Sequence, residues 1–201
     1  EFINDAMTGG AQPRITSYFS NSPLGMDEGP AEGRVKEFLM RWEDNLLPGA
    51  LEGYALPVSD GSERNRKGTA AALALLSSAG WVIQNGVLTN ESTGEPFAFD
   101  ILLETGSSEN ASIIDMYVQA LERIGVTPTI TTVDSAQFKE RTDAYDFDMT
   151  YYRVGVSLSP GNEQRLYWGS EGVEAPGTKN WMGMNSPAPA MRSTAIWACA
   201  A

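Results

Sequence analysis

The clearest periodic signal lies near the middle of the chain, where every second residue is apolar. The alternating positions are Phe97, Phe99, Ile101 and Leu103. This spacing predicts a strand with one fully apolar face. Further strands are predicted over 126–133 and 147–152. Two short apolar runs, 81–83 and 87–88, flank Asn85-Gly86, which predicts a β-hairpin.

The sequence predicts six helices, from helical spacing of apolar residues and from start and stop signals. They cover 2–7, 31–47, 65–79, a segment from Ser107 or Ser108 to 124, a segment from Asp134 or Ser135 to 141, and 162–168. The run 70–76 is nearly all apolar, which predicts burial on most sides. The expected core face of the fourth helix is Ile113, Ile114, Tyr117, Leu121 and Ile124.

Strands alternate with helices from residue 65 to residue 152. This order implies crossover connections and an α/β fold, with a largely parallel or mixed sheet flanked by helices. Pro128 predicts an edge position, or one near a strand start. The strand at 147–152 runs into a loop of small polar residues, 154–164, which is typical of a strand that ends at a binding crevice.

Charge and composition exclude several kinds of function. The formal net charge of −12 argues against nucleic acid and anionic membrane surfaces as partners. The chain has no histidine, so it can form neither a Ser-His-Asp triad nor a His-rich metal site. Its one cysteine, Cys199, can form no internal disulfide. No phosphate loop or metal-ligand cluster is present in the sequence, and we expect no cofactor.

Several short motifs resemble, in order and spacing, the signature of extracellular solute-binding proteins, family 5, which serve peptide ABC transporters. The matching stretches are Leu73–Trp81, Gly94–Phe97, Leu121–Gly125, Val133-Asp134 with Gln137-Phe138, Asp146–Met149, and Trp168, Asn180 and Gly183–Pro187. Two stretches, 14–22 and 157–164, look more like the branch that handles muropeptides and microcin C-type peptides.

The resemblance implies one lobe of a type II periplasmic-binding-protein fold. Residues 1–188 would be a partial C-terminal lobe that lacks the N-terminal lobe of the same protein. The tail 189–201 does not match, and we expect it to be disordered or frame-shifted. The implied setting is the bacterial periplasm, although no signal peptide is present in this chain. The implied partners are permease subunits and a peptide or muropeptide-like ligand.

The family places its ligand at the loop after the Asp146–Met149 motif. Carried over, this gives Arg153, Ser157, Leu158 and Ser159 as ligand-binding residues. Arg153 would pair with a ligand carboxylate, or else form a surface ion pair. General oligopeptide binders carry an aspartate in this loop for the free ammonium of the peptide, and this loop has serines instead.

A second candidate region contains Arg14, Ser17 and Tyr18. The adjacent aromatic residues Tyr18 and Phe19 would either flank a ligand or pack into the core. Trp168 and Trp181 have the same two interpretations, with the core favoured.

Two other functional classes stay open at the level of the sequence. One is a non-functional fragment of a degraded or truncated gene. The other is a hydrolase, for which Asp146 and Asp148 form a carboxylate pair on one strand, although solvated surface acids explain them more simply. The segment 155–159 misses the Gly-x-Ser-x-Gly elbow by its last residue. A solute-binding lobe does no chemistry, so we expect no enzymatic activity.

Overall fold

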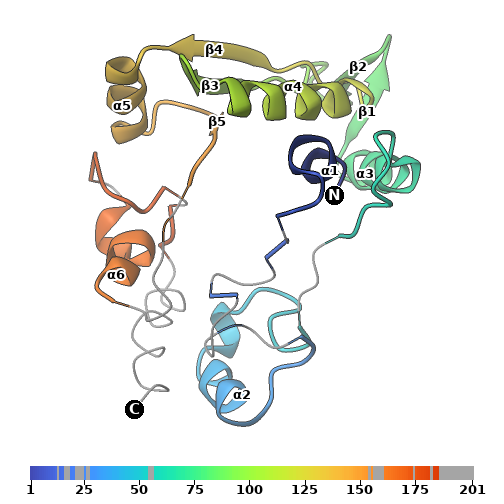
Figure 1. Ribbon diagram of the computed structural model, residues 1–201. Coiled ribbons are helices and arrows are strands. Elements are labelled where there is room, and N and C mark those ends of the chain that lie inside the picture. The colour runs from blue at the N-terminus through green and yellow to red at the C-terminus, as the bar shows by residue number, and fades with distance from the viewer. Residues whose placement is uncertain are drawn as a thin grey trace. The chain divides into compact units, whose positions relative to one another are not determined.

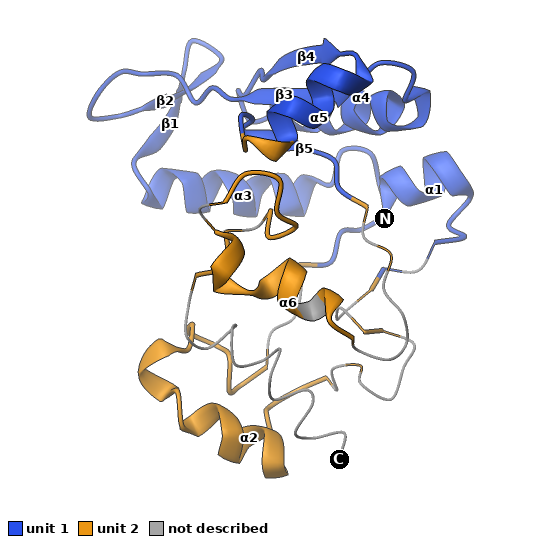
Figure 2. Ribbon diagram, turned by 90° about the vertical axis from the view of Figure 1, so that its left-hand side faces the viewer, with its two compact units in different colours: residues 1–14, 58–142, 146–152 blue, residues 15–57, 143–145, 153–201 orange. Residues whose placement is uncertain are grey.

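A computed structural model describes residues 1–12, 14–15, 19–20, 25, 28–53, 57–153, 155, 161–173, 175–181 and 183–185. The chain forms two compact units (Figure 2). Unit 1 comprises Glu1–Arg14, Val58–Thr142 and Asp146–Tyr152. Unit 2 comprises the described residues within 15–57, 143–145 and 153–201.

A three-stranded parallel sheet is the centre of unit 1 (Figure 1). The strands are β3 (Asp100–Glu104), β4 (Thr129–Val133) and β5 (Met149–Thr150), in the order β4-β3-β5. β3 pairs along its whole length with β4, from Asp100↔Thr129 to Glu104↔Val133. β5 adds two paired positions on the other side of β3. The parallel pairing and the crossover helices confirm the α/β class.

The hydrophobic core of unit 1 forms where α4 (Ser108–Glu122) packs on β3. Ile101 and Leu103 of β3 and Ile114 of α4 are buried. Five partly buried residues pack against them: Phe99, Tyr117, Val118, Met149 and Tyr151. The apolar alternation of β3 therefore faces α4 as predicted, and Ile114 and Tyr117 were both expected on the core face of that helix.

The second crossover helix is α5 (Ser135–Asp143), which joins β4 to β5. The carboxylate of Asp134 accepts hydrogen bonds from the backbone amides of Ala136 and Gln137, each at 2.9 Å. These two amides lie in the first turn, where a helix supplies no carbonyl partners of its own. Asp134 thus fixes the helix start that the sequence predicted.

An antiparallel hairpin forms a separate two-stranded sheet in unit 1. β1 (Trp81–Gln84) pairs with β2 (Val87–Asn90), and the turn residues Asn85 and Gly86 have φ values of 52° and 85°. Two successive positive φ values are those of a type I′ turn, which matches the twist of a hairpin. The backbone amide of Leu88 donates to the carbonyl of Gly125 at 2.8 Å and attaches the hairpin to the end of α4.

Two further helices belong to unit 1. α1 (Phe2–Thr8) ends at Gly9, which adopts the left-handed conformation with φ of 64°. α3 (Arg66–Ser78) begins after Asn65, whose side chain accepts from the amide of Gly68. The prediction that α3 is buried on most sides is wrong for the described chain: none of its residues is buried, and Leu75 is 73% exposed. β1 packs against this helix, and no other described helix or strand contacts it to a similar extent.

The described part of unit 2 contains short helices and turns. They are α2 (Gly33–Met40), the 3₁₀ helix η1 (Glu43–Asn45), α6 (Glu163–Trp168) and the 3₁₀ helix η2 (Ser170–Gly172). Asn180 is 1% exposed and its amide nitrogen donates to the carbonyls of Gly169 and Met184, at 3.1 and 3.0 Å. Its side-chain oxygen accepts from the amide of Met184 at 3.0 Å. One buried side chain therefore holds the 169–184 segment closed.

Several predicted boundaries are wrong. The helix expected over 31–47 ends at Met40, and the strand expected over 147–152 is only Met149–Thr150. The strand predicted from residue 97 begins at Asp100, because Phe97 instead donates its amide to Leu88 beside the hairpin. None of the described helices is long and apolar enough to cross a membrane.

Candidate ligand-binding site

The carboxyl ends of β3, β4 and β5 meet at one edge of the parallel sheet, because parallel strands all end on the same side (Figure 1). In open α/β sheets this edge is where ligands bind. Thr105 follows β3 and donates from both its backbone amide and its hydroxyl to the carbonyl of Val133, at 2.8 and 3.0 Å. These bonds fix the start of the loop between β3 and α4 at that edge.

Three polar side chains come together at this edge: Glu104, Ser107 and Tyr151. We call them the carboxyl-edge cluster. The Tyr151 hydroxyl donates to the Glu104 carboxylate oxygen Oε2 at 3.2 Å. The Ser107 hydroxyl lies 3.4 Å from the Tyr151 hydroxyl. Since the one proton of the phenol goes to Glu104, Ser107 must be the donor in the second contact. The cluster brings together residues from the end of β3, the start of α4 and the segment after β5.

The Tyr151 ring is held on two sides, which fixes the position of its hydroxyl. It stacks on Phe138 of α5, with ring centroids 5.6 Å apart and planes inclined by 20°. It also packs against the core cluster formed by Ile101, Leu103 and Ile114. Because both hydroxyl protons are donated inside the cluster, it offers acceptor oxygens to the donor groups of a bound solute.

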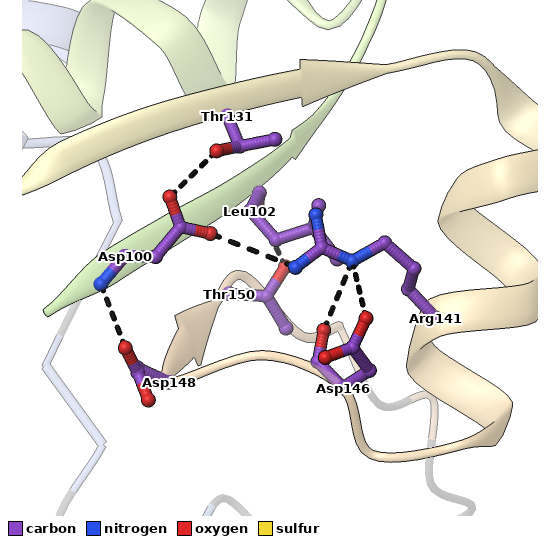
Figure 3. Close-up of polar contacts among 7 residues, drawn as sticks. All are labelled: Asp100, Leu102, Thr131, Arg141, Asp146, Asp148 and Thr150. Carbon is purple, nitrogen blue, oxygen red and sulfur yellow. Dashed lines mark hydrogen bonds and ion pairs between the residues drawn. The ribbon is translucent and has the colours of Figure 1, made fainter.

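The opposite, amino-terminal end of the sheet carries a second polar network (Figure 3). Asp100 accepts from the Thr131 hydroxyl at 2.6 Å and donates its backbone amide to Asp148 at 2.8 Å. Arg141 of α5 lies 3.8 Å from the Asp100 carboxylate, and its Nε donates to the Asp146 carboxylate at 2.9 Å. Asp146 and Asp148, considered above as a carboxylate pair, are therefore each engaged in contacts that tie β3, α5 and β5 together.

The structure describes two of the seven ligand-binding residues predicted from sequence. Arg153 is exposed and follows β5 by three positions. Arg14 forms an ion pair with Glu1, with 3.7 Å between Nη1 and Oε1. The Ser59 hydroxyl also hydrogen-bonds to Glu1 and is the main cause that lowers the pKa of that carboxylate. The other five, Ser17, Tyr18, Ser157, Leu158 and Ser159, lie outside the described residues, as does the tail 189–201.

The aromatic and metal-site predictions can be compared with the described residues. Phe19 is buried at 7% exposed, as a core side chain would be, and Trp168 and Trp181 are half-buried. Among the residues with a described position, no group of three or more acidic or cysteine side chains could hold a metal ion.

Sequence reasoning missed Glu104, Ser107 and Tyr151 as a cluster. The available signal was the position of Glu104 directly after an apolar strand.

Comparison with known proteins identifies the family. Residues 1–175 match the model for the bacterial extracellular solute-binding proteins, family 5 Middle. The chain belongs to this family. The resemblance expected from the motifs is thereby confirmed.

Individual relatives agree with this assignment. The chain is 33% identical to the protein named "Probable peptide-binding protein YejA" from Agrobacterium fabrum, over 94% of this chain and 30% of that protein. It is 34% identical to "Peptidoglycan-binding protein YepA" from the same organism, over 93% of this chain and 30% of that protein. The chain therefore spans less than a third of the length of these relatives.

A solved structure with the same fold is the oligopeptide-binding protein AppA from Bacillus subtilis in complex with a nonapeptide. Its TM-score is 0.58 at 17% sequence identity, and the match covers 96% of this chain and 32% of that one. The likeness confirms the periplasmic-binding type of fold.

Much of the family signature maintains the fold. Gly80 and Gly125 have φ values of 82° and 80°, which L side chains rarely adopt. Asp134 caps α5, Asp148 accepts from β3 and Asn180 closes the 169–184 segment. These residues of the motifs therefore maintain local backbone geometry.

Proposed function

We propose that this chain is the ligand-facing part of the substrate-binding component of a peptide ABC transporter, which captures a peptide-like solute between two lobes. The observation that carries the proposal is the carboxyl-edge cluster, formed in a chain of the family 5 solute-binding proteins. In such two-lobe proteins the lobes close over the ligand by a hinge motion. The partners would be the N-terminal lobe of the same protein and permease subunits in the periplasm.

The proposed ligand is a muropeptide-like peptide. Two findings support this class. The loop from Arg153 to Asn162 contains no aspartate or glutamate, so it lacks a carboxylate for the free amino end of a peptide. The relative YepA is named a peptidoglycan-binding protein and the relative YejA a peptide-binding protein. A peptide whose amino end is blocked would suit a loop without an acid.

The ligand-binding residues predicted from the sequence would then have defined roles. Arg153 would hold a ligand carboxylate through its planar guanidinium group. Ser157 and Ser159 would form hydrogen bonds to the peptide backbone, with Leu158 in contact beside them. Arg14, Ser17 and Tyr18 would line a second contact region. These roles are proposals, to be tested residue by residue.

The test is a nuclear magnetic resonance titration of the ¹⁵N-labelled 201-residue chain with the peptide N-acetyl-Ala-γ-D-Glu-Lys. We expect saturable shifts of the backbone amides at 104–107 and 151–153. We also expect weak affinity, in the millimolar range, since a surface that covers only part of a ligand forms only part of its contacts. Micromolar binding by calorimetry would contradict the expected affinity. The absence of saturable shifts, or shifts confined to the amino-terminal end of the sheet, would contradict the proposed site.

A further inference from the structure

The acids near the expected ligand loop are not available to a ligand cation. No aspartate or glutamate occurs between Arg153 and Asn162. The next acid along the chain is Glu163, and its Oε1 accepts from the backbone amide of Gly161 at 2.8 Å. A carboxylate that meets a cationic group of a peptide ligand would therefore come from outside this loop.

The strand-associated aspartates of unit 1 already have structural contacts. Asp100, Asp146 and Asp148 form the network with Arg141 at the amino-terminal end of the sheet (Figure 3). Asp134 accepts from two amides of α5. Asp100, Asp146 and Asp148 therefore lie at the end of the sheet opposite the carboxyl edge, and Asp134 uses Oδ1 to cap α5.

Glu104 differs from these aspartates in both place and partner. It is the last residue of β3, the middle strand, and its position is at the edge where ligands of open α/β sheets bind. In the part of the chain that the structure describes, its carboxylate pairs with the Tyr151 hydroxyl and with no cation. A neutral hydroxyl leaves the negative charge of a carboxylate uncompensated.

The carboxylate is also held in one orientation before a ligand arrives. Tyr151 donates to one oxygen of Glu104, while its ring is fixed by Phe138 and by the core. The Ser107 hydroxyl, at 3.4 Å, occupies the remaining acceptor side of the phenol. An acceptor that neighbouring residues already hold in place loses little conformational entropy when it binds a donor.

We propose that Glu104 is a specificity-determining residue that binds a side-chain ammonium group of the peptide-like ligand, with Tyr151 as the residue that positions its carboxylate. This inference rests on the proposed function and names the chemical group that the site selects. An ammonium group offers three donors to a carboxylate, and its charge replaces the missing counter-ion.

The experiment compares two probes that differ only in the cation. N-acetyl-Ala-γ-D-Glu-Lys carries one ammonium group, and N-acetyl-Ala-γ-D-Glu-norleucine lacks it and ends in a methyl group at the Cε position. Both are titrated into the ¹⁵N-labelled chain and into the variants Glu104→Gln, Tyr151→Phe and Glu122→Gln. Glu122 is exposed at the opposite end of α4, so its substitution removes the same charge away from the cluster. Dispersed amide spectra identify the variants that remain folded.

The wild-type chain is expected to bind the lysine peptide about threefold to fivefold more tightly than the norleucine peptide, the preference that a partly exposed ion pair supplies. Glu104→Gln abolishes this preference, because the lysine peptide loses its ion pair and its affinity falls to that of the norleucine peptide. Tyr151→Phe reduces the preference in the same direction, an effect on the ratio that simple loss of packing would not produce. Glu122→Gln leaves the ratio unchanged.

Two contrary results have different meanings. Equal affinities of the two peptides for the wild-type chain, or a preference that survives Glu104→Gln, would overturn the role of Glu104 while peptide binding itself stands. Failure of both peptides to shift any amide of the folded wild-type chain would overturn the proposed function together with this inference.

Discussion

Gly125 combines a left-handed backbone conformation with a close approach to another part of the backbone. An added methyl group at this position should therefore cost more stability than the conformation alone explains. Gly125 has φ of +80°, and a Cβ atom built on it would lie 2.7 Å from the backbone nitrogen of Leu88 and 3.1 Å from the carbonyl oxygen of Gly86. Both neighbours are backbone atoms of the β1–β2 hairpin, so no flexible side chain can move aside. Gly125→Ala should therefore push the hairpin away and break the 2.8 Å bond from the Leu88 amide to the Gly125 carbonyl.

The matched control is Gly94→Ala, because Gly94 has φ of +75° and an added Cβ would meet nothing within 4 Å. The left-handed conformation costs about 1–2 kcal/mol for an alanine at either position. Gly125→Ala adds about 1 kcal/mol for the lost hydrogen bond and about 1–3 kcal/mol for overpacking. We therefore expect the free energy of unfolding to fall by about 2–4 kcal/mol more for Gly125→Ala than for Gly94→Ala.

The assay is urea unfolding followed by far-ultraviolet circular dichroism, together with native-state hydrogen exchange of the Leu88 amide. Gly125→Ala should lower the urea midpoint further and remove the protection of Leu88, and Gly94→Ala should leave that protection in place. Equal midpoints for the two variants, or a protected Leu88 amide in Gly125→Ala, would refute the reasoning from close approach.

Two further variants test local electrostatics. Asp134→Ala should lower the free energy of unfolding in urea by about 1 kcal/mol, because α5 loses the acceptor of two first-turn amides; an unchanged midpoint would contradict the capping role. The pKa of Glu171 is lowered by its hydrogen bonds and ion pair with Arg165, so Arg165→Gln should raise it towards the ordinary carboxyl value in a ¹³C-detected titration. Because the pKa is lowered in the folded state, any stability from this pair is present above the ordinary carboxyl range and is lost as the pH falls through the lowered value. A Glu171 titration identical in both proteins would contradict the pairing.

The parts of the fold that follow from local sequence were predicted well. Asn85-Gly86 supplies two residues that accept positive φ, so the hairpin needs no distant information. The alternation that ends at Leu103 identifies the buried face of β3, and Asp134 marks the start of α5. In each case the determining interactions involve residues close together in the chain.

The parts that depend on tertiary packing were predicted poorly. α2 buries none of its residues, so helical propensity between 31 and 47 is not reinforced by packing and the helix ends at Met40. α3 is rich in apolar residues, yet none of them is buried. A sequence shows which residues can be buried, but it does not show what covers them.

The carboxyl-edge cluster shows the same limit for the functional site. Glu104 and Tyr151 are 47 residues apart, and parallel pairing of β3 with β5 brings them together. The sequence predicted strands up to Leu103 and over 147–152, but it could not show which strand ends adjoin. The residues carried over from the family follow one strand, whereas the cluster draws on three segments.

The most direct test of the account is where on the parallel sheet a peptide binds. The peptide Ala-γ-D-Glu-Lys with a nitroxide-bearing acyl group at its amino end, in place of the acetyl group, broadens nearby amide resonances of the ¹⁵N-labelled chain with a steep dependence on distance. We predict stronger broadening at Gly106 and Ser107, beyond the carboxyl end of β3, than at Asp100 and Thr129, at the amino-terminal ends of β3 and β4. Broadening that is stronger at Asp100 and Thr129, or equal at the two ends, would contradict ligand binding at the carboxyl edge.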